Sequence, residues 1–493
     1  MIVLKDCLCI VRPNPSGSGN LAGADVHIEG NRIVRVGKNL PVPEGARVID
    51  ASRHVVTPGF VNTHHHFYQT LTRNLPAVQN AKLFEWLVYL YEVWKGIDEE
   101  AVYWSSRLAL AELVKTGCTC TTDHHYLYPR GFSQDLPGIQ FQAAADIGVR
   151  FAPTRGSMSR SKKDGGLPPD SVVQDEDTIL AQCEETIRKY HDPAPDSMRR
   201  VALAPCSPFS VSEQLMKDSA VLARKYGARL HTHLAETGDE DDYCVKIYKR
   251  RPLKVMEDCG FLGPDVWYAH GIHFNDQELD VLARPGPGVA HCPSSNLRLA
   301  SGIAPIREMR ARGVNVALGL DSNTLNDNGD PWQELRLASH LHRQPGTNTL
   351  AAAGSPWLAM ATTGGARALG MEGAIGALRR GAKADMILVN TDRITTPVAV
   401  AGGNPVELLL ARGEARDVDS VMIDGKWVMR ERKLLGIDKS ELTAELRDQV
   451  KASLAQRGEV VSSGLREILP LAGRINRVAQ DALGSPYYHL NSR

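Results

Sequence analysis

The sequence has no net charge, no long hydrophobic run and no regular spacing of cysteines. Lysine plus arginine and aspartate plus glutamate both number 57, so the formal net charge at pH 7 is zero. This balance favours neither nucleic acid nor an anionic membrane as a partner. No stretch approaches the ~18 uninterrupted apolar residues of a membrane-spanning helix. The nine cysteines are scattered and the first residues lack a secretion-signal layout, so we expect free thiols and a cytoplasmic protein.

Two kinds of pattern divide the chain. At 493 residues it exceeds one ordinary domain, and 43% hydrophobic residues can fill a large core. Short β-type runs separated by turn signals occupy the first 57 residues and return between residues 385 and 430. Between these two regions, apolar runs alternate with helical stretches. Such stretches include residues 99–116, 178–191, 212–226 and 303–312. The alternation predicts an α/β fold, a (β/α)8 barrel flanked by two halves of one β-sandwich.

The stretch from residue 55 to residue 74 organises the rest of the chain. An apolar, β-branched run interrupted by Pro58-Gly59 ends in three histidines, which is typical of a buried strand with polar side chains at its tip. Because alternate residues of a strand share a face, His64 and His66 can point at one metal ion while His65 points away. Taken alone, the pair fits equally well as surface histidines or as histidines satisfied in a polar core.

Four further polar residues lie at the ends of later apolar runs. His231 and His233 form a second His-x-His pair. The other two are the single residues His270 and Asp321. In a parallel β/α barrel the C-terminal ends of the strands meet at one face. We therefore expect these side chains to share a single site with the first histidine pair.

The order HxH, HxHxxE, H and D resembles that of metal-dependent amidohydrolases of the cytosine deaminase-like branch. The resemblance covers nearly the whole chain and is closest to 8-oxoguanine deaminases and hydroxydechloroatrazine ethylaminohydrolase-like enzymes. The motifs that carry it are His64-His65-His66-Phe67-Tyr68-Gln69-Thr70-Leu71-Thr72-Arg73, Asp123-His124-His125-Tyr126-Leu127, Gly156-Ser157-Met158-Ser159 and Asp164-Gly165-Gly166-Leu167-Pro168-Pro169-Asp170. The expected domains are the barrel over residues 58–372, sandwich halves over 1–57 and 373–440, and a helical extension over 441–493.

By this resemblance the metal ligands are His64, His66, His233 and Asp321. The cofactor is one divalent ion, Zn²⁺ or alternatively Fe²⁺, which suits three imidazoles and one carboxylate. His233 is preferred to His231 because the family places a glutamate three residues after this ligand, here Glu236. His231 stays open as a ligand, its other reading being a structural role beside the site. An ion held in this way has room for a water molecule, whose pKa it lowers from 15.7 towards ~7.

Three residues are expected to act on the reacting atoms. Asp321 can accept the proton that the water loses, and Glu236 can protonate a ring nitrogen of the substrate. The resemblance gives His270 the role of steadying charge on the attacking oxygen, although it could also be a further ligand, and His273 is a weaker candidate. Glu236 could instead be an exposed loop carboxylate beside the acidic residues 239–242.

The loops supply the candidates for substrate binding. The amide of Gln69 suits a purine-like edge because it offers both donors and an acceptor. Trp86 could stack on a flat ring or pack in the core. Arg155 and Ser157 follow the third barrel strand and could bind a carbonyl-rich face. For Asn296, a role in shaping the loop and a functional role fit the sequence equally well.

The expected function is deamination of a small amino-substituted N-heterocycle, with 8-oxoguanine to urate plus ammonia as the first candidate by resemblance. One departure bears on the substrate, because the loop after Asp321 carries Ser322 and Leu325 where the resembled enzymes have small residues. This loop is expected to form part of the pocket wall. Family members often associate, so the resemblance also implies a homo-oligomer.

Two other functions remain open. One is hydrolysis of an alkylamine, chloride or sulfur substituent on a triazine or imidazolone ring. The other is a non-catalytic binding scaffold built on a degenerate barrel. A zinc enzyme of the cytidine deaminase type is excluded, because the segment Pro205-Cys206-Ser207-Pro208 lacks the second cysteine of a Pro-Cys-x-x-Cys element.

Overall fold

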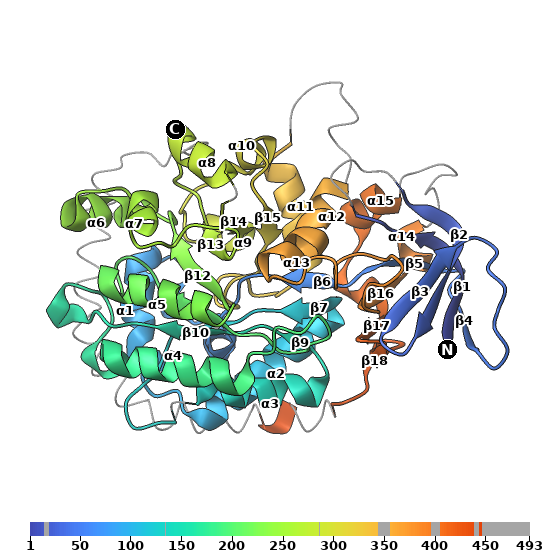
Figure 1. Cartoon of the computed structure of the whole chain (residues 1–493), viewed down its shortest axis with the longest axis horizontal. Helices are drawn as coiled ribbons and strands as arrows, with labels where there is room; N and C mark the ends of the chain where they lie inside the picture. Colours follow the sequence, from blue (N-terminus) through green and yellow to red (C-terminus); the bar gives the residue numbers. More distant parts are fainter. Residues whose placement is uncertain are drawn as a thin grey trace.

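A parallel barrel forms the centre of the molecule, seen here in a computed structural model that describes residues 1–13, 19–133, 135–284, 286–343, 355–395, 405–437 and 443–445 (Figure 1). Ten short strands occupy its eight positions. In barrel order they are β6 (Phe60–Asn62), β7 (Cys118–Thr121) with β8 (His124–His125), β9 (Arg150–Phe151) with β10 (Thr154–Ser157), β11 (Ala202–Pro205), β12 (Arg229–Leu234), β13 (Val266–His270), β14 (Gly288–His291) and β15 (Val316–Leu318). The Thr63 N–H donates to the Leu318 carbonyl over 3.0 Å and joins the last position to the first. The predicted barrel is confirmed.

Helices follow the strands and cover the outside of the barrel. They are α2 (Glu99–Lys115), α3 (Leu136–Ile147), α4 (Glu176–Tyr190), α5 (Glu213–Lys225), α6 (Gly238–Tyr248), α7 (Pro252–Asp258), α8 (Asp276–Ala283), α9 (Pro293–Arg298), α10 (Ile306–Ala311), α11 (Pro331–Leu341), α12 (Ser355–Ala359) and α13 (Gly365–Ala368). Their starts follow from local chemistry: the Ser212 hydroxyl, for example, accepts the Leu215 N–H over 3.0 Å and caps α5. Outside this series, α1 (Leu83–Trp94) carries an apolar cluster of its own that includes Trp86 and Leu325.

Two extended runs of the sequence, over residues 149–154 and 55–63, are each interrupted as strands for a local reason. The run over residues 149–154 is split into β9 and β10 by Pro153, which has no N–H to donate to a neighbouring strand. The run over residues 55–63 serves two sheets, because β5 (His54–Pro58) pairs with strands outside the barrel and β6 pairs inside it. The chain changes sheets at Gly59, where a Cβ would lie 2.1 Å from the Thr119 Cγ2. Only glycine fits this approach of the two segments.

The second sheet combines both ends of the chain, as predicted. Its strands are β1 (Ile2–Ile10), β2 (Leu21–Glu29), β3 (Arg32–Gly37), β4 (Arg47–Asp50), β5, β16 (Met386–Asn390), β17 (Val418–Ile423), β18 (Lys426–Arg430) and β19 (Lys433–Leu434). The first half of β1 pairs with β4 and its second half with β5, and β5 then pairs with β16. In Figure 1 the blue N-terminal strands accordingly lie beside the orange and red C-terminal ones. Leu4, Ile28, Met386 and Met422 are among the side chains that share the core of this domain. Two helices, α14 (Asp392–Thr395) and α15 (Pro405–Arg412), follow β16.

A buried ion pair joins the barrel to this second sheet. Arg150, in β9, donates to both carboxylate oxygens of Asp385 over 2.9 and 3.1 Å. The side chains of Arg150 and Asp385 are each 1% exposed, and Asp424 lies 3.4 Å from the same guanidinium. Such a pair holds the two parts in one register because either charge alone would be strongly disfavoured in this environment.

The helical extension predicted over residues 441–493 lies outside the described residues, apart from residues 443–445. Among the helices that the structure describes, none combines the length and apolar character needed to cross a bilayer.

Candidate active site

Four side chains from three barrel strands converge at the C-terminal mouth of the barrel. His64 and His66 follow β6, His233 lies in β12, and Asp321 follows β15. The Nε2 atoms of His64 and His66 lie 3.5 and 3.4 Å from the Asp321 Oδ1, and the His233 Nε2 lies 3.3 Å from the His66 Nε2. Two ligand atoms bound about 2.1 Å from one ion at the tetrahedral angle are about 3.4 Å apart. The separations therefore fit a single ion of the size of Zn²⁺.

The tautomers of His66 and His233 are fixed by backbone carbonyls. Each imidazole donates its Nδ1–H over 2.7 Å, His66 to the carbonyl of His124 and His233 to the carbonyl of Cys206. The proton at Nδ1 leaves a lone pair at Nε2, the atom that faces the centre. A metal ligand needs this orientation.

His64 is oriented by another histidine rather than by a carbonyl. The His231 Nδ1–H donates to the Trp267 carbonyl over 2.8 Å, so the His231 Nε2 accepts the Nδ1–H of His64, also over 2.8 Å. The remaining His64 Nε2 is buried and has no hydrogen-bond partner within the described chain. His231, which the sequence left open as a ligand, is thus placed as the residue that orients His64.

Burial keeps these histidines neutral. It lowers the pKa of His66, and it lowers the pKa values of His64 and His233 far below the usual value. Neutral imidazoles bind cations and do not repel one another, so these three imidazoles and the Asp321 carboxylate fit a divalent ion. Two further histidines approach the same space: the groups His64, His124, His233 and His64, His270, Asp321 each bring ligand-type atoms within 4.8 Å of one another.

Asp321 is held as an anion by its surroundings. Burial alone would raise its pKa, but His270, His66 and a hydrogen bond from Ser295 outweigh burial and lower it. The Ser295 hydroxyl donates to the Oδ2, and the Ser322 N–H donates to the Oδ1 over 2.7 Å. The backbone of Asp321 has a φ of 60°, a strained conformation of the kind that collects at functional sites.

Glu236 faces His270 on the opposite side of the same centre. The Glu236 Oε1 lies 3.6 Å from the His270 Nε2, and burial raises the pKa of Glu236 to about 7. The His270 Nδ1–H donates to the Asn296 Oδ1 over 2.9 Å, so its Nε2 is free to accept a proton. Asn296 therefore positions His270. A carboxyl group with a pKa near neutrality can donate and recover a proton at physiological pH.

A residue that sequence reasoning missed holds the Glu236 loop. The fully buried carboxylate of Glu240 accepts the backbone N–H groups of Ala235 and Glu236 over 3.0 and 2.9 Å. The sequence places this glutamate in an acidic run that reads as exposed. The sequence feature that could have identified Glu240 is its position three residues after Thr237. The Thr237 side chain caps α6 and accepts the Glu240 N–H.

A narrow cavity of about 30 Å³ opens above these groups. Its polar lining consists of His66, Gln69, Tyr126, His233, Glu236, His270 and Asp321. Its apolar lining consists of Leu83, Trp86, Leu87, Tyr91, Cys206, Phe209 and Leu325. The lining contains no lysine or arginine, so the cavity suits a neutral molecule rather than a phosphate-bearing one.

Two of the four predicted substrate contacts lie in this cavity. The Gln69 amide nitrogen donates to the hydroxyls of Tyr68 and Tyr126 over 3.1 and 3.2 Å, and its Oε1 has no partner in the described chain. Gln69 can therefore offer a ligand an acceptor. The Trp86 Nε1 is also buried without a partner in the described chain, and the residue is 3% exposed. Trp86 can therefore offer a ligand a donor.

The structure does not bring Arg155 and Ser157 into the cavity. The buried Arg155 guanidinium stacks on Tyr128 at 3.6 Å and donates to the side chains of Gln174 and Gln182 over 2.9 and 2.6 Å. Ser157 lies at the end of β10 and is buried. Sequence position alone could not show that the arginine points between the strand and α4. Neither residue lines the cavity, so a substrate contact by either one stays a prediction.

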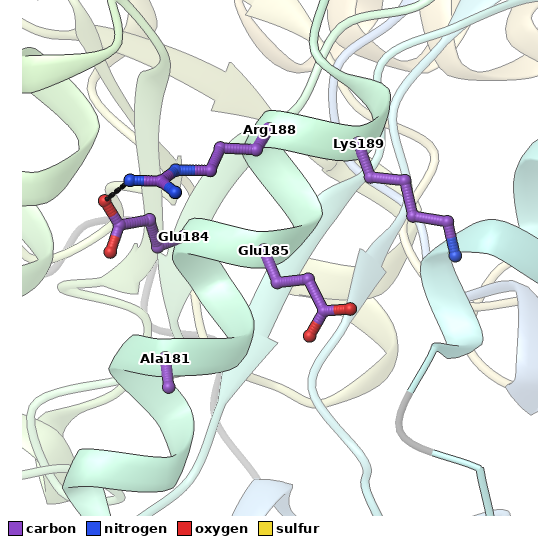
Figure 2. Close-up of a pocket in the computed structure, with 5 residues that line it drawn as sticks. All are labelled: Ala181, Glu184, Glu185, Arg188 and Lys189. Carbon is purple, nitrogen blue, oxygen red and sulfur yellow. Dashed lines mark hydrogen bonds and ion pairs between the residues drawn. The ribbon is translucent and has the colours of Figure 1, made fainter.

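A hollow on the outer face of α4 has the chemistry of an ordinary helix surface. It is lined by Ala181, Glu184, Glu185, Arg188 and Lys189, all from one helix (Figure 2). Arg188 pairs with Glu184 over 3.0 Å, one helical turn away. Exposed pairs of this kind are ordinary on helix surfaces.

The chain is similar to known proteins over most of its length. Residues 55–428 match the model of the amidohydrolase family. The chain is 42% identical to 8-oxoguanine deaminase of Pseudomonas aeruginosa, over 89% of this chain and 97% of the relative. It is 36% identical to hydroxydechloroatrazine ethylaminohydrolase of Pseudomonas sp. strain ADP, over 86% and 89% of the two chains. Among solved structures, atrazine chlorohydrolase of Arthrobacter aurescens TC1 complexed with zinc superposes with a TM-score of 0.85 at 28% identity, over 91% and 100% of the two chains.

Proposed function

Since this chain belongs to the amidohydrolase family, and is a hydrolase that acts on C–N bonds, we propose that it removes ammonia from a neutral, amino-substituted heterocyclic base, with 8-oxoguanine to urate as the reaction to test first. The observation that carries the proposal is the convergence of three imidazole lone pairs and one carboxylate below a cavity without cationic side chains. The 8-oxoguanine deaminase among its relatives, identical at 42% of positions, supports the choice of substrate.

We assign the metal site to His64, His66, His233 and Asp321. A divalent ion held there, Zn²⁺ or Fe²⁺, supplies a water molecule with a pKa lowered from 15.7 to about 7, and hence a nucleophile at neutral pH. The Asp321 Oδ2, which faces the His270 Nε2 across 3.9 Å, is placed to take up a proton. His270, held by Asn296, can stabilise negative charge that develops beside it.

Glu236 is proposed as the proton donor to the substrate. Its carboxyl group is buried, and the rise of its pKa to about 7 keeps a large protonated fraction at neutral pH. A proton delivered to a ring nitrogen makes the adjacent amine-bearing carbon more electrophilic. Asp321 can then pass its proton to the departing nitrogen, so that ammonia leaves. The proton of the added hydroxyl returns to Glu236, and an oxo group remains on the ring.

The polar groups of the cavity fit an oxopurine. Gln69 has an unpartnered acceptor and Trp86 an unpartnered donor. An 8-oxoguanine molecule carries ring N–H groups next to carbonyl groups, so its edge can satisfy both. The flat ring can also lie against the aromatic side chains of Trp86 and Tyr91.

Hydrolysis of a different leaving group is the second candidate. It is favoured by likeness to an ethylaminohydrolase and to an atrazine chlorohydrolase. A panel of purines, pyrimidines and triazines, assayed for ammonia as well as for alkylamine and chloride, separates the two. Ammonia release from 8-oxoguanine with urate as product supports the proposal, and release of only other groups from triazines contradicts it.

We expect the purified protein to carry about one equivalent of divalent metal per chain, and its activity to depend on this metal. Removal with a chelator should abolish turnover, and added Zn²⁺ should restore it. His233→Ala should lower metal content because it removes one of four ligands. Elemental analysis together with the ammonia assay checks both results, and full activity of metal-free protein would refute the assignment.

We expect Gln69→Leu to lower kcat/KM for the preferred base about 10- to 100-fold, because a buried hydrogen bond to the substrate is lost. Metal content should not change, since Gln69 is not a proposed ligand. Gln142→Leu on the exposed face of α3 is the matched control, because the Gln142 amide donates to the Asp146 carboxylate over 2.7 Å and does not line the cavity. Equal kinetics of the two variants would exclude Gln69 as a substrate contact.

A further inference from the structure

The active cavity and a second hollow share one lining residue. Leu325, on the loop that follows Asp321, is the residue that lines both. The second hollow lies between that loop, α9 and α11, and its lining includes Leu297, Arg298, Asn326 and Asp327. The Leu325 side chain is only 5% exposed and belongs to the apolar cluster around α1. Leu325 is therefore a partition between the two hollows and not a surface residue.

The partition is held in place by hydrogen bonds of its own loop. The N–H groups of Leu325 and Asn326 both donate to the Ser322 carbonyl, over 2.9 and 2.7 Å. The Asn326 amide nitrogen donates to the Leu320 carbonyl over 3.1 Å, and the Ser322 and Thr324 hydroxyls share a hydrogen bond of 2.6 Å. These bonds hold the backbone of Leu325 in place, and its side chain packs in the apolar cluster around α1.

Two residues that line the second hollow each carry a buried acceptor atom. Within the described chain, the Asn326 Oδ1 and the Asp327 Oδ1 are enclosed yet have no hydrogen-bond partner. Both are acceptors, and Asn326 is only 2% exposed. Arg298 donates to the other oxygen of Asp327 over 2.7 Å and holds that side chain in place. Two vacant acceptors suit a molecule that presents neighbouring hydroxyl donors, as a pentose does.

We propose that Leu325 determines substrate specificity by confining this enzyme to free heterocyclic bases, and that its removal joins the cavity to a hollow able to hold the sugar of a nucleoside. The inference rests on the proposed function in that the reaction is deamination of a heterocyclic base. It goes beyond that function by naming the residue that rejects nucleosides and the place where their sugar would lie.

The test compares bases with their nucleosides in the full-length, Zn²⁺-loaded enzyme. The pairs are 8-oxoguanine and 8-oxoguanosine, guanine and guanosine, and adenine and adenosine. For whichever base is turned over, we expect the wild type to favour the base over its nucleoside by at least about 100-fold in kcat/KM, and Leu325→Ala to raise the nucleoside-to-base ratio at least about tenfold. Leu325→Val should give a smaller rise in the same direction, and it serves where the alanine variant does not fold.

Two controls locate the effect. Leu297→Ala alters the second hollow alone, at a residue that is 41% exposed, and should leave the ratio unchanged. Adding Asp327→Ala to Leu325→Ala should reverse most of the gain without changing turnover of the base, because one hydroxyl acceptor is lost. A gain that survives this second change would overturn the placement of the sugar.

A binding measurement separates this inference from the proposed reaction. Nucleoside affinity is measured by equilibrium dialysis on the Zn²⁺-loaded Glu236→Gln protein, with and without Leu325→Ala. If no base is turned over, the proposed reaction fails, yet tighter nucleoside binding with Leu325→Ala still supports the partition. Unchanged nucleoside affinity and an unchanged ratio, with base turnover retained, would overturn it.

Discussion

Glu236→Gln is expected to lower turnover by a factor on the order of 10² or more while the metal stays bound. The amide has nearly the shape of the carboxyl group but cannot deliver a proton to the substrate. The environment of Glu236 makes this loss specific, because burial raises its pKa to about 7 and so maintains a proton donor at neutral pH. Substrate affinity should change much less than kcat, since the lost interaction belongs to the transition state.

Glu185→Gln offers a matched control for this experiment. It is the same chemical change at an exposed position on the outer face of α4 (Figure 2), and it should alter neither kcat nor KM. Metal content and circular dichroism show whether Glu236→Gln keeps its fold and its ion. Turnover within about threefold of the wild type, with metal bound, would rule out the proton-donor role.

Arg150→Met is expected to lower the free energy of unfolding by about 3–5 kcal/mol. The change removes the cation between two carboxylates and leaves Asp385, whose side chain is 1% exposed, without a charge partner. An uncompensated buried charge is costly, so the barrel and the second sheet should separate more easily. Urea unfolding followed by far-ultraviolet circular dichroism measures the loss.

The control for this loss is an ion pair of similar composition on the surface. Arg188→Met removes a pair whose side chains are 64% and 31% exposed, and it should cost no more than about 1 kcal/mol because water screens the charges. Equal destabilisation by the two variants would show that Arg150 contributes no more than a surface residue.

The sequence predicted the barrel and the converging residues because both follow from local rules. Strand alternation placed His64 and His66 on one side, and the barrel brings strand ends such as His233 and Asp321 together. The split of the run over residues 55–63 was not predictable from its apolar pattern, since it depends on the approach of Thr119 to Gly59. Tertiary contact decides such cases.

The environments of individual polar residues were harder to predict than their positions. Glu240 lies in an acidic run that is typical of solvent-exposed sequence, yet its carboxylate is buried against two backbone N–H groups. Arg155 follows a strand that contributes to the mouth, but its guanidinium stacks on Tyr128. Side-chain direction at a strand end depends on neighbours that sequence spacing does not identify.

Because the chain passes from the second sheet into the barrel at Gly59, no fragment boundary at this point separates the barrel from the second sheet without loss. A fragment that begins at residue 60 would lose β5, and with it the backbone partner of β16, so an unsatisfied strand edge would replace a paired one. The histidines of the catalytic centre start only a few residues downstream of that cut. A graft of this barrel should therefore carry both chain ends along with it, since the terminal sheet anchors the loop that bears His64 and His66.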